Sequence, residues 1–273
     1  MRNLKLTLAY DGTEFSGWQV QPGRDTIQGA LVSAIGRLTG ENVLPQGSGR
    51  TDAGVHALAQ VASFTTGSAI PVENFQRALN GMLPPAIRVM DVCEAPTEFH
   101  ARKSALAKTY QYRMFRGEVC SPFVTRFVWH YPYPLDEAAM MRAAEQVVGE
   151  RDFTSFAAVD VEKSSTPFPV ASSRFEAGGE LGAERSAPAG ETSNVRRIFE
   201  SSWERMGDEF IYRVRGSGFL HHMVRNLVGT FMLVGKGTLS VEDIGRILGA
   251  RSRSAAGATA PAGGLCLVGV EYE

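Results

Sequence analysis

The sequence lacks the features of a disulfide-linked, zinc-binding or membrane-spanning protein. Its 273 residues include three widely spaced cysteines, Cys93, Cys120 and Cys266. No C-x-x-C pair is present, so neither a disulfide framework nor a zinc site is indicated. No stretch approaches the ~20 apolar residues of a membrane helix, and the N-terminal MRNLKLTLAYDG has no signal-peptide pattern. We therefore expect a cytoplasmic protein with no membrane segment.

An excess of charge and several common catalytic signatures are also missing. The formal net charge is −1 and the charged fraction is 21%, which argues against global disorder but does not itself indicate nucleic-acid binding. There is no P-loop, no G-x-G-x-x-G after a strand and no G-x-S-x-G nucleophile elbow. The length of 273 residues is enough for one large domain or two medium ones, and the hydrophobic fraction of 44% is enough for a sizeable core.

The patterns that are present predict two cycles of strands and helices. Alternating apolar residues indicate strands, and apolar stripes at helical spacing indicate helices. In the first cycle, we expect strands at 4–10, 60–66 and 86–93, and helices beginning at Asp25 and Pro71. Gln28 would complete a capping box with Asp25, and Gly40 would end that helix. In the second cycle, we expect strands at 107–115, 195–205, 209–216 and 265–272, and helices at 135–148 and 219–234.

These cycles predict an α+β protein made of two similar α/β halves, each with a largely antiparallel sheet. We place the halves at residues 1–104 and 105–273. Residues 160–194 are rich in Ser, Ala, Gly, Glu and Pro, which is typical of a long, mobile surface insertion. Residues 252–264 have a similar composition and predict a flexible connection before the final strand.

The first candidate site is the loop Gly49-Arg50-Thr51-Asp52-Ala53-Gly54. An aspartate between glycines is usually a turn residue that accepts hydrogen bonds from nearby backbone amides. The alternative is a nucleophile or base, because glycines allow close approach and loops on a rigid sheet often hold catalytic groups. Composition alone leaves both interpretations open.

The second candidate region is a basic, aromatic stretch from residue 100 to residue 130. It contains Arg102, Lys103 and Lys108 among six cations, interleaved with six aromatic residues and a single acid, Glu118. It could be an amphipathic strand with solvated cations. It could also be a groove for a phosphate backbone, with rings available for stacking.

The third candidate region is the segment from Ser217 to Asn226. Two adjacent histidines on a helix would point ~100° apart, and no acid lies at ligand spacing, so a metal site at His221 and His222 is not indicated. Arg225 lies among apolar residues. A partly buried arginine requires a carboxylate, and Asp52 is a candidate partner.

Together these segments resemble the tRNA pseudouridine synthase A family over nearly the whole chain. The resembling stretches are LAYDGTEFSGWQVQP at 8–22, TIQGAL at 26–31, GSGRTDAGVHALAQVASF at 47–64, FHARKSALAKTYQY at 99–112, DFTSF at 152–156, GSGFLHHMVRNLVGT at 216–230 and GLCLVGVEY at 264–272. The predicted insertion at 160–194 is longer than the family pattern.

The resemblance implies a pseudouridine synthase fold, with two similar halves flanking a basic RNA-binding cleft, active as a homodimer. It implies isomerisation of uridine to pseudouridine at positions 38, 39 and 40 of the tRNA anticodon stem-loop. It also implies that no cofactor and no metal takes part.

The resemblance assigns roles to individual residues. Asp52 would be the catalytic nucleophile, attacking C6 of uracil or C1′ of ribose, or would act as a base at the 2′ position. Arg225 would be the second catalytic residue and would keep the Asp52 carboxylate charged. Tyr110 would stack on the uracil and help to remove the C5 proton, Arg50 would enter the space left by the flipped base, and Leu265 would close the apolar side of the pocket. Phosphate contacts would come from Arg102, Lys103 and Lys108.

Three other interpretations remain. The chain could modify another RNA position, or it could be an RNA-binding protein on the same scaffold without catalysis. A hydrolase using Asp52 with His56 is the third, and it lacks an evident second carboxylate for paired acid–base work.

Overall fold

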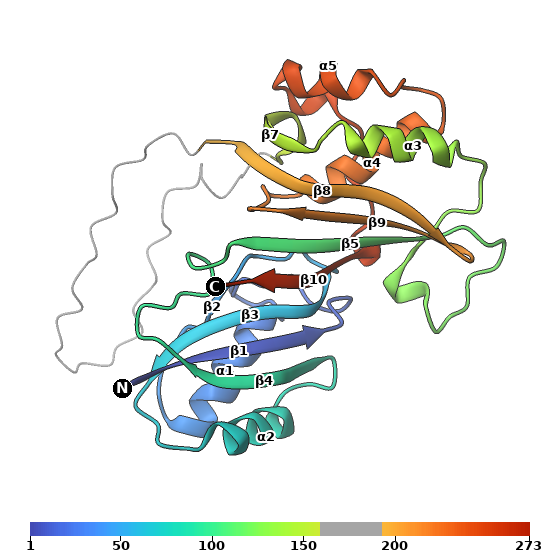
Figure 1. Ribbon diagram of the computed structural model, residues 1–273. Coiled ribbons are helices and arrows are strands. Elements are labelled where there is room, and N and C mark those ends of the chain that lie inside the picture. The colour runs from blue at the N-terminus through green and yellow to red at the C-terminus, as the bar shows by residue number, and fades with distance from the viewer. Residues whose placement is uncertain (159–192) are drawn as a thin grey trace.

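The computed structural model describes residues 1–158 and 193–273 (Figure 1). The predicted insertion at 160–194 falls outside the described residues, apart from its last two positions.

The described residues form one continuous, mostly antiparallel sheet, which confirms the α+β class. Its strands follow the order β4-β1-β3-β10-β5-β9-β8-β7, with β2 paired to β3 and β6 paired to β5. Their bounds are β1 (Arg2–Tyr10), β2 (Gln46–Gly47), β3 (His56–Thr66), β4 (Ile87–Ala95), β5 (Ala107–Phe115), β6 (Trp129–His130), β7 (Gly149–Asp152), β8 (Val195–Met206), β9 (Glu209–Gly216) and β10 (Leu265–Glu271).

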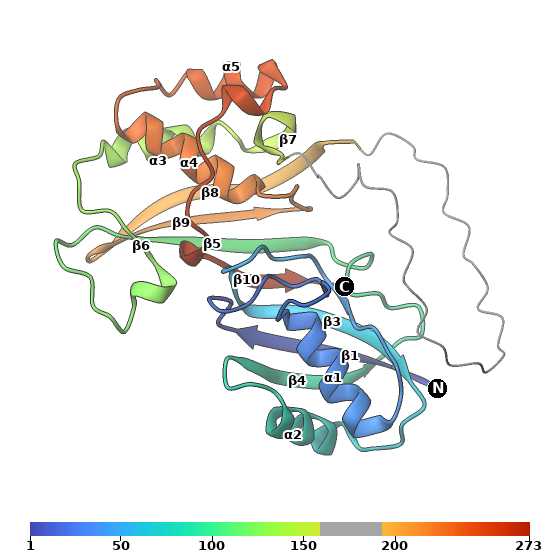
Figure 2. The ribbon, with the colours of Figure 1, turned by 180° about the vertical axis from the view of Figure 1, so that it is seen from behind.

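Helices cover one face of this sheet, behind it in Figure 1 and in front of it in Figure 2. They are α1 (Ile27–Thr39), α2 (Val72–Met82), α3 (Glu137–Glu145), α4 (Met223–Gly235) and α5 (Asp243–Ala250). Strand side chains on this face form the core because they alternate inward and outward. Leu4, Leu6 and Leu8 of β1 and Tyr112 of β5 are fully buried. In the part of the chain that the structure describes, no helix has the length and hydrophobicity to cross a membrane.

The two ends of α1 show where local signals were interpreted correctly and where they were not. Gly40 ends the helix with a φ of 76°, as predicted. At the other end, the predicted capping box at Asp25 is wrong, because Thr26 is the N-cap and its hydroxyl accepts from the Gly29 amide. The Gln28 side chain accepts from the Val20 amide and donates to the Pro45 carbonyl instead. A threonine next to an aspartate offers the same cap, and the sequence alone did not choose between them.

Strand β10 joins the strands that precede it in the sequence into one sheet. It pairs antiparallel with β5 over six positions and parallel with β3 over two, Cys266 with His56 and Leu267 with Ala57. Through these two pairs, the β4-β1-β3 strands and the β5-β9-β8-β7 strands become neighbours. The loop that precedes β3 is therefore brought beside the elements that follow β5.

The helix predicted at 219–234 begins four residues later than expected. The α4 helix begins at Met223, and His222 has a left-handed conformation with a φ of 60°. Residues 219–222 therefore lie outside the helix, and their side chains do not follow the helical periodicity. Strand β7 and helix α5 were not predicted at all.

The segment predicted to be a flexible connection at 252–264 is packed against α4. A Cβ atom on Gly229 would lie 1.7 Å from the Ala258 carbonyl oxygen, so only glycine permits this approach. The Ala260 amide donates to the Arg225 carbonyl. Small residues, which suggested flexibility in the sequence, here allow two backbones to come into contact.

Candidate active site

The loop that contains Asp52 is held from both sides by buried groups. The Tyr10 hydroxyl lies 2.8 Å from the Thr51 hydroxyl, and the Trp18 amide donates to the Thr51 carbonyl. Gly54 has a φ of 77°, a conformation that favours glycine. With Thr51 and Gly54 fixed on either side, Asp52 has a defined position just before β3.

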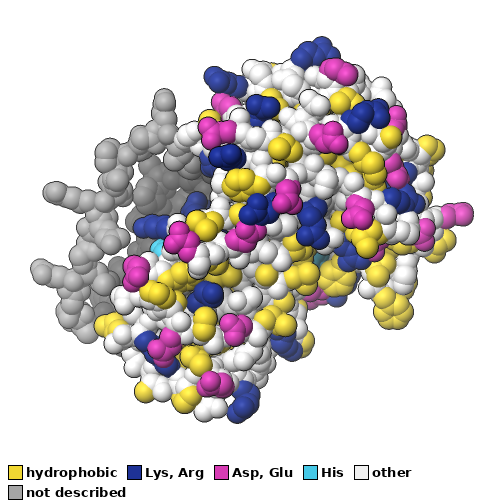
Figure 3. Space-filling model, viewed as in Figure 1, with side chains coloured by type: hydrophobic (Ala, Val, Ile, Leu, Met, Phe, Trp, Pro, Cys, Tyr) yellow, Lys and Arg dark blue, Asp and Glu magenta, His cyan; other side chains and the backbone are white. Residues whose placement is uncertain are grey.

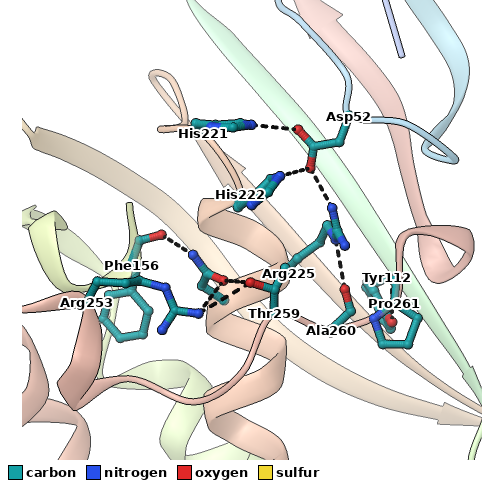
Figure 4. Close-up of polar contacts among 11 residues, drawn as sticks. Asp52, Tyr112, Phe156, His221, His222, Arg225, Arg253, Thr259, Ala260 and Pro261 are labelled. Atoms are coloured by element: carbon teal, nitrogen blue, oxygen red, sulfur yellow. Dashed lines mark hydrogen bonds and ion pairs between the residues drawn. The ribbon is translucent and has the colours of Figure 1, made fainter. Parts of the chain in front are cut away.

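The Asp52 carboxylate faces a cation from the other end of the sequence (Figure 4). Arg225 Nη1 donates to Asp52 Oδ2 at 2.9 Å, and Arg225 Nε donates to the Ala260 carbonyl. The two side chains are 15% and 17% exposed. The predicted Asp52–Arg225 pair is therefore confirmed. Asp52 does begin a turn, since its carbonyl accepts from the Val55 amide, but within residues 1–158 and 193–273 no backbone amide donates to its carboxylate.

Two histidines complete the surroundings of Asp52. His221 Nε2 lies 3.6 Å from Oδ1, and His222 Nε2 lies 3.4 Å from Oδ2. The imidazole rings are 4.0 Å apart between centroids. Burial lowers the pKa of His222, although the Asp52 charge acts in the opposite direction. The neutral imidazole is thus the favoured form of His222 at pH 7.

Sequence reasoning missed these histidines because it placed them on a helix, pointing apart. The left-handed backbone of His222 removes that restriction and turns both rings toward Asp52 (Figure 4).

Tyr110 lies on β5 with 7% of its surface exposed. Its ring contacts the edge of Phe219, at 5.1 Å between centroids. Burial strongly raises the pKa of Tyr110, and the nearby Tyr10 and Asp52 raise it further. The hydroxyl therefore keeps its proton in the free protein, which makes it a weak proton acceptor.

Lys108 lies two residues before Tyr110, on the same face of β5, and reaches the Asp52 loop. Its Nζ donates to the Ser48 carbonyl at 2.5 Å. Burial lowers the pKa of Lys108 to about 8, with smaller contributions from Arg102 and Arg196. Lys108 thus connects the loop to β5 and forms part of a group of cations that repel one another.

The other predicted residues are more dispersed. Arg50 and Arg102 are exposed in loops, and Leu265 is buried at the start of β10, opposite Tyr112. Lys103 lines a separate hollow with Phe99 and His100, whose lining does not include Asp52. The structure therefore brings Asp52, Arg225 and Tyr110 together and leaves Lys103 apart.

A buried polar network behind Arg225 fixes the position of α4. Asn226 donates to the Phe156 carbonyl at 2.7 Å. Its side-chain oxygen accepts from the Thr259 hydroxyl and from Arg253 (Figure 4). These contacts hold residues 253–260 against the helix, and the Ala260 carbonyl then accepts from Arg225. The sequence did not reveal this network, because its members are far apart along the chain.

Comparison with known proteins assigns the chain to a class. Residues 7–102 and 179–273 match the family model described as tRNA pseudouridine synthase. A protein named tRNA pseudouridine synthase A from Solibacter usitatus is 51% identical over 272 residues, covering 100% of both chains. A protein of the same name from Moorella thermoacetica is 43% identical over 271 residues, covering 98% of this chain and 99% of its own.

The mixed sheet and these matches define a pseudouridine synthase, an isomerase that converts uridine to pseudouridine. The chain belongs to the tRNA pseudouridine synthase family, which confirms the resemblance seen in the sequence. A chain in the structure titled "Crystal Structure of a Cbf5-Nop10-Gar1 Complex" aligns with 97% of this chain and 48% of its own, at 12% identity and a TM-score of 0.35. That likeness is too slight to support an argument.

Proposed function

We propose that this chain isomerises uridines 38, 39 and 40 of the tRNA anticodon stem-loop, with Asp52 as the nucleophile. The choice of tRNA follows the names of its full-length relatives. The observation that supports the catalytic role is the Asp52–Arg225 pair, which joins a loop before β3 to a helix near the other end of the sequence. A carboxylate held in this way is fixed in orientation, and one of its oxygens faces away from the guanidinium.

The chemistry requires little equipment besides a carboxylate. The bond from C1′ to N1 breaks, the uracil rotates, and a new bond joins C1′ to C5, so every heavy atom is retained. Asp52 would attack C6 or C1′, or would remove a proton at the 2′ position. Each route uses the ionised carboxylate, and the Arg225 guanidinium stabilises that charge. The proton released from C5 exchanges with solvent and can be followed as an isotope.

The apolar side of the proposed base pocket comes from β5, β10 and the segment before α4. Tyr110 offers a ring for stacking, with Phe219 fixing its orientation. Leu265 is 5% exposed and faces the same side of the sheet. Because the Tyr110 hydroxyl holds its proton, we assign it a role in packing and hydrogen-bond donation to the base, rather than proton abstraction in the free form.

The RNA backbone would be bound by cations on either side of Asp52. Arg50 belongs to the loop that contains Asp52, and Lys108 contacts Ser48, directly before that loop. Arg102 lies near Lys108. Flipping the target nucleotide costs a few kcal/mol of stacking. Arg50, two residues from Asp52, is positioned to occupy the vacated space and bind phosphate. Lys103 would contact RNA farther from the reacting base.

We also propose the division into halves at residue 104 and the homodimer. The β4-β1-β3 strands are joined to the rest of the sheet by only two parallel residue pairs between β3 and β10 in the described part of the chain. The sheet face that the helices leave uncovered shows hydrophobic side chains among charged ones (Figure 3). Leu58 of β3 and Phe199 of β8 are 63% and 36% exposed. A second copy of the chain would cover such a surface.

Release of tritium from C5-labelled uridine in an unmodified tRNA transcript tests the proposal. We expect release by the wild type, and its loss in a transcript with cytidine at positions 38, 39 and 40. Release that persists in that transcript would place the target elsewhere in the RNA. No release from either transcript, despite tight binding, would favour an RNA-binding protein without catalysis.

A further inference from the structure

Asp52, His221 and His222 present three ligand atoms to one point in space. One atom from each side chain lies within 4.8 Å of the other two. The carboxylate-to-imidazole distances are 3.6 Å for His221 and 3.4 Å for His222. Two ligands bound about 2.05 Å from a tetrahedral ion lie about 3.3 Å apart. Each carboxylate-to-imidazole distance is therefore close to the ligand separation of a tetrahedral metal site before any ion is added, although the two imidazoles face different oxygens of Asp52.

The chemistry of this ligand set selects the ion. Two imidazoles and one carboxylate suit Zn²⁺ and its neighbours in the first transition row, whereas Mg²⁺ prefers oxygen ligands and keeps its water. His222 and His221 are 28% and 43% exposed, so an ion can enter from solvent. The fourth position would be taken by water.

Arg225 is the main obstacle to a cation at this point. Its guanidinium donates to Oδ2, so a metal ion bound to the same carboxylate would be repelled by it. His221, however, faces Oδ1, the oxygen to which Arg225 does not donate. Figure 4 shows Arg225 and His221 approaching the carboxylate from different sides. His222 lies nearest Oδ2, the oxygen to which Arg225 already donates. The ion would therefore bind the carboxylate through Oδ1, where it leaves the Arg225 hydrogen bond in place, at reduced affinity.

We propose that Asp52, His221 and His222 form an inhibitory site for a transition-metal ion such as Zn²⁺. The ion would not be a cofactor. It would occupy the lone pairs of Asp52 that the reaction uses and would block the approach of the base. The inhibition rests on the proposed function, whereas the binding of metal does not.

Calorimetric titration of the tag-free, full-length chain with Zn²⁺ tests the binding. We expect one ion per chain, and at least ~10-fold weaker binding in His221→Asn and in His222→Asn, since losing a ligand costs at least as much as losing a group that supports one. His130→Asn is the matched control: its ring contacts the Gly117 carbonyl, away from Asp52, and its titration should match the wild type. Equal Zn²⁺ affinity in the wild type and in the His221→Asn/His222→Asn double variant would overturn the proposal.

Tritium release tests the inhibition, with each variant compared to its own metal-free rate. Zn²⁺ should reduce the wild-type rate at the concentration that fills the site, a chelator should restore it, and Mg²⁺ should not replace Zn²⁺. Equal inhibition of the double variant would show that the metal acts on the RNA and would refute the inhibitory role. A metal-free wild type without tritium release would instead contradict the proposed function, and calorimetry would still decide the metal site.

Discussion

The molecule contains two groups of aspartate, histidine and arginine that differ in how fully their polar atoms are used. In the first, Asp11 lies against His56 and Arg126. Thr13 donates to the same carboxylate through its amide and its hydroxyl. Although burial opposes it, these hydrogen bonds and the two neighbouring side chains lower the pKa of Asp11.

The histidine of this first group is equally occupied. His56 Nδ1 accepts from the Gly12 amide, and Nε2 donates to the Arg126 carbonyl. Its ring packs on Phe127, and 5% of its side chain is exposed. A histidine with both nitrogens engaged in this way is fixed in one neutral tautomer. The hydrolase hypothesis, which paired His56 with Asp52, is wrong, because the chain belongs to a family of isomerases and His56 faces Asp11.

The group around Asp52 has the same residue types with looser contacts. Arg225 makes one hydrogen bond to the carboxylate, whereas the two histidines make longer contacts with it, at 3.4 Å for His222 and 3.6 Å for His221. The same residue types therefore form a tightly bonded group around Asp11 and a more loosely bonded one around Asp52. In the reaction that we propose, the single hydrogen bond from Arg225 leaves the Asp52 carboxylate able to react.

The largest expected difference comes from removing each carboxylate. Asp52→Asn should reduce tritium release by at least about a thousandfold, the scale on which enzymes lose activity without their nucleophile. Its tRNA affinity, measured by filter binding, should stay within a few-fold of the wild type. Asp11→Asn is the matched variant and should retain most of the wild-type rate. Similar rates for the two variants would remove the distinction between the groups.

Removing the arginine of the reactive group should affect both activity and stability. Arg225→Ala leaves Asp52 and the Ala260 carbonyl without their donor. We expect about a hundredfold loss of kcat and a loss of about 2 kcal/mol in the free energy of unfolding, reduced from the fully buried case by the partial exposure of the pair. Urea denaturation and tritium release measure the two effects. Arg225→Lys should recover part of the activity, and an alanine variant that melts and reacts like the wild type would show that the pair is irrelevant.

In the group around Asp11, removing the histidine should reduce stability and leave activity nearly unchanged. His56→Leu leaves the Gly12 amide and the Arg126 carbonyl unpaired, which should lower the free energy of unfolding by about 2 kcal/mol. The kcat of the folded variant should change by less than about threefold, since His56 does not contact Asp52. A fall in kcat of much more than threefold in the folded variant would mean that His56 takes part in the reaction.

The smallest effect concerns Lys108, a cation whose neighbours are also cations. Its pKa is about 8 in the folded chain, against an ordinary value of 10.5. Between these values the unfolded chain holds a proton that the folded chain lacks, so the free energy of unfolding should rise with pH from about 8. We expect a gain of about 1 kcal/mol relative to Lys108→Met, measured by urea denaturation at several pH values. Parallel pH curves for the two proteins would contradict the depressed pKa.

Sequence patterns were sufficient wherever structure depends on nearby residues. The apolar alternation at Leu4, Leu6 and Leu8 predicted β1, and Gly40 marked the end of α1. The Asp52–Arg225 pair was also predicted, because a partly buried arginine needs a carboxylate. Predictions that depend on neighbouring residues, or on the need of a buried charge for a partner, were therefore confirmed by the structure.

The failures arose where contacts between distant residues decide the outcome. His222 has a left-handed backbone and contacts Asp52, which lies 170 positions earlier in the sequence. Helical periodicity could not predict this conformation. The small residues at 252–264 suggested flexibility, yet Gly229 of α4 makes room for them. Helix α5 carries an apolar stripe of Ile244, Ile247 and Leu248 that was visible in the sequence and was overlooked.

The position of β10 has a consequence for how the chain is made. This strand follows every other described element in the sequence, yet it lies between β3 and β5 in the sheet. During synthesis, earlier strands can pair among themselves, but the ribosome must first release residues 265–271 before β3 and β5 are joined. Closing so long a loop is slow relative to local pairing. Asp52 and Arg225 are therefore both synthesised before β10, and the proposed catalytic site is assembled only after residues 265–271 have left the ribosome.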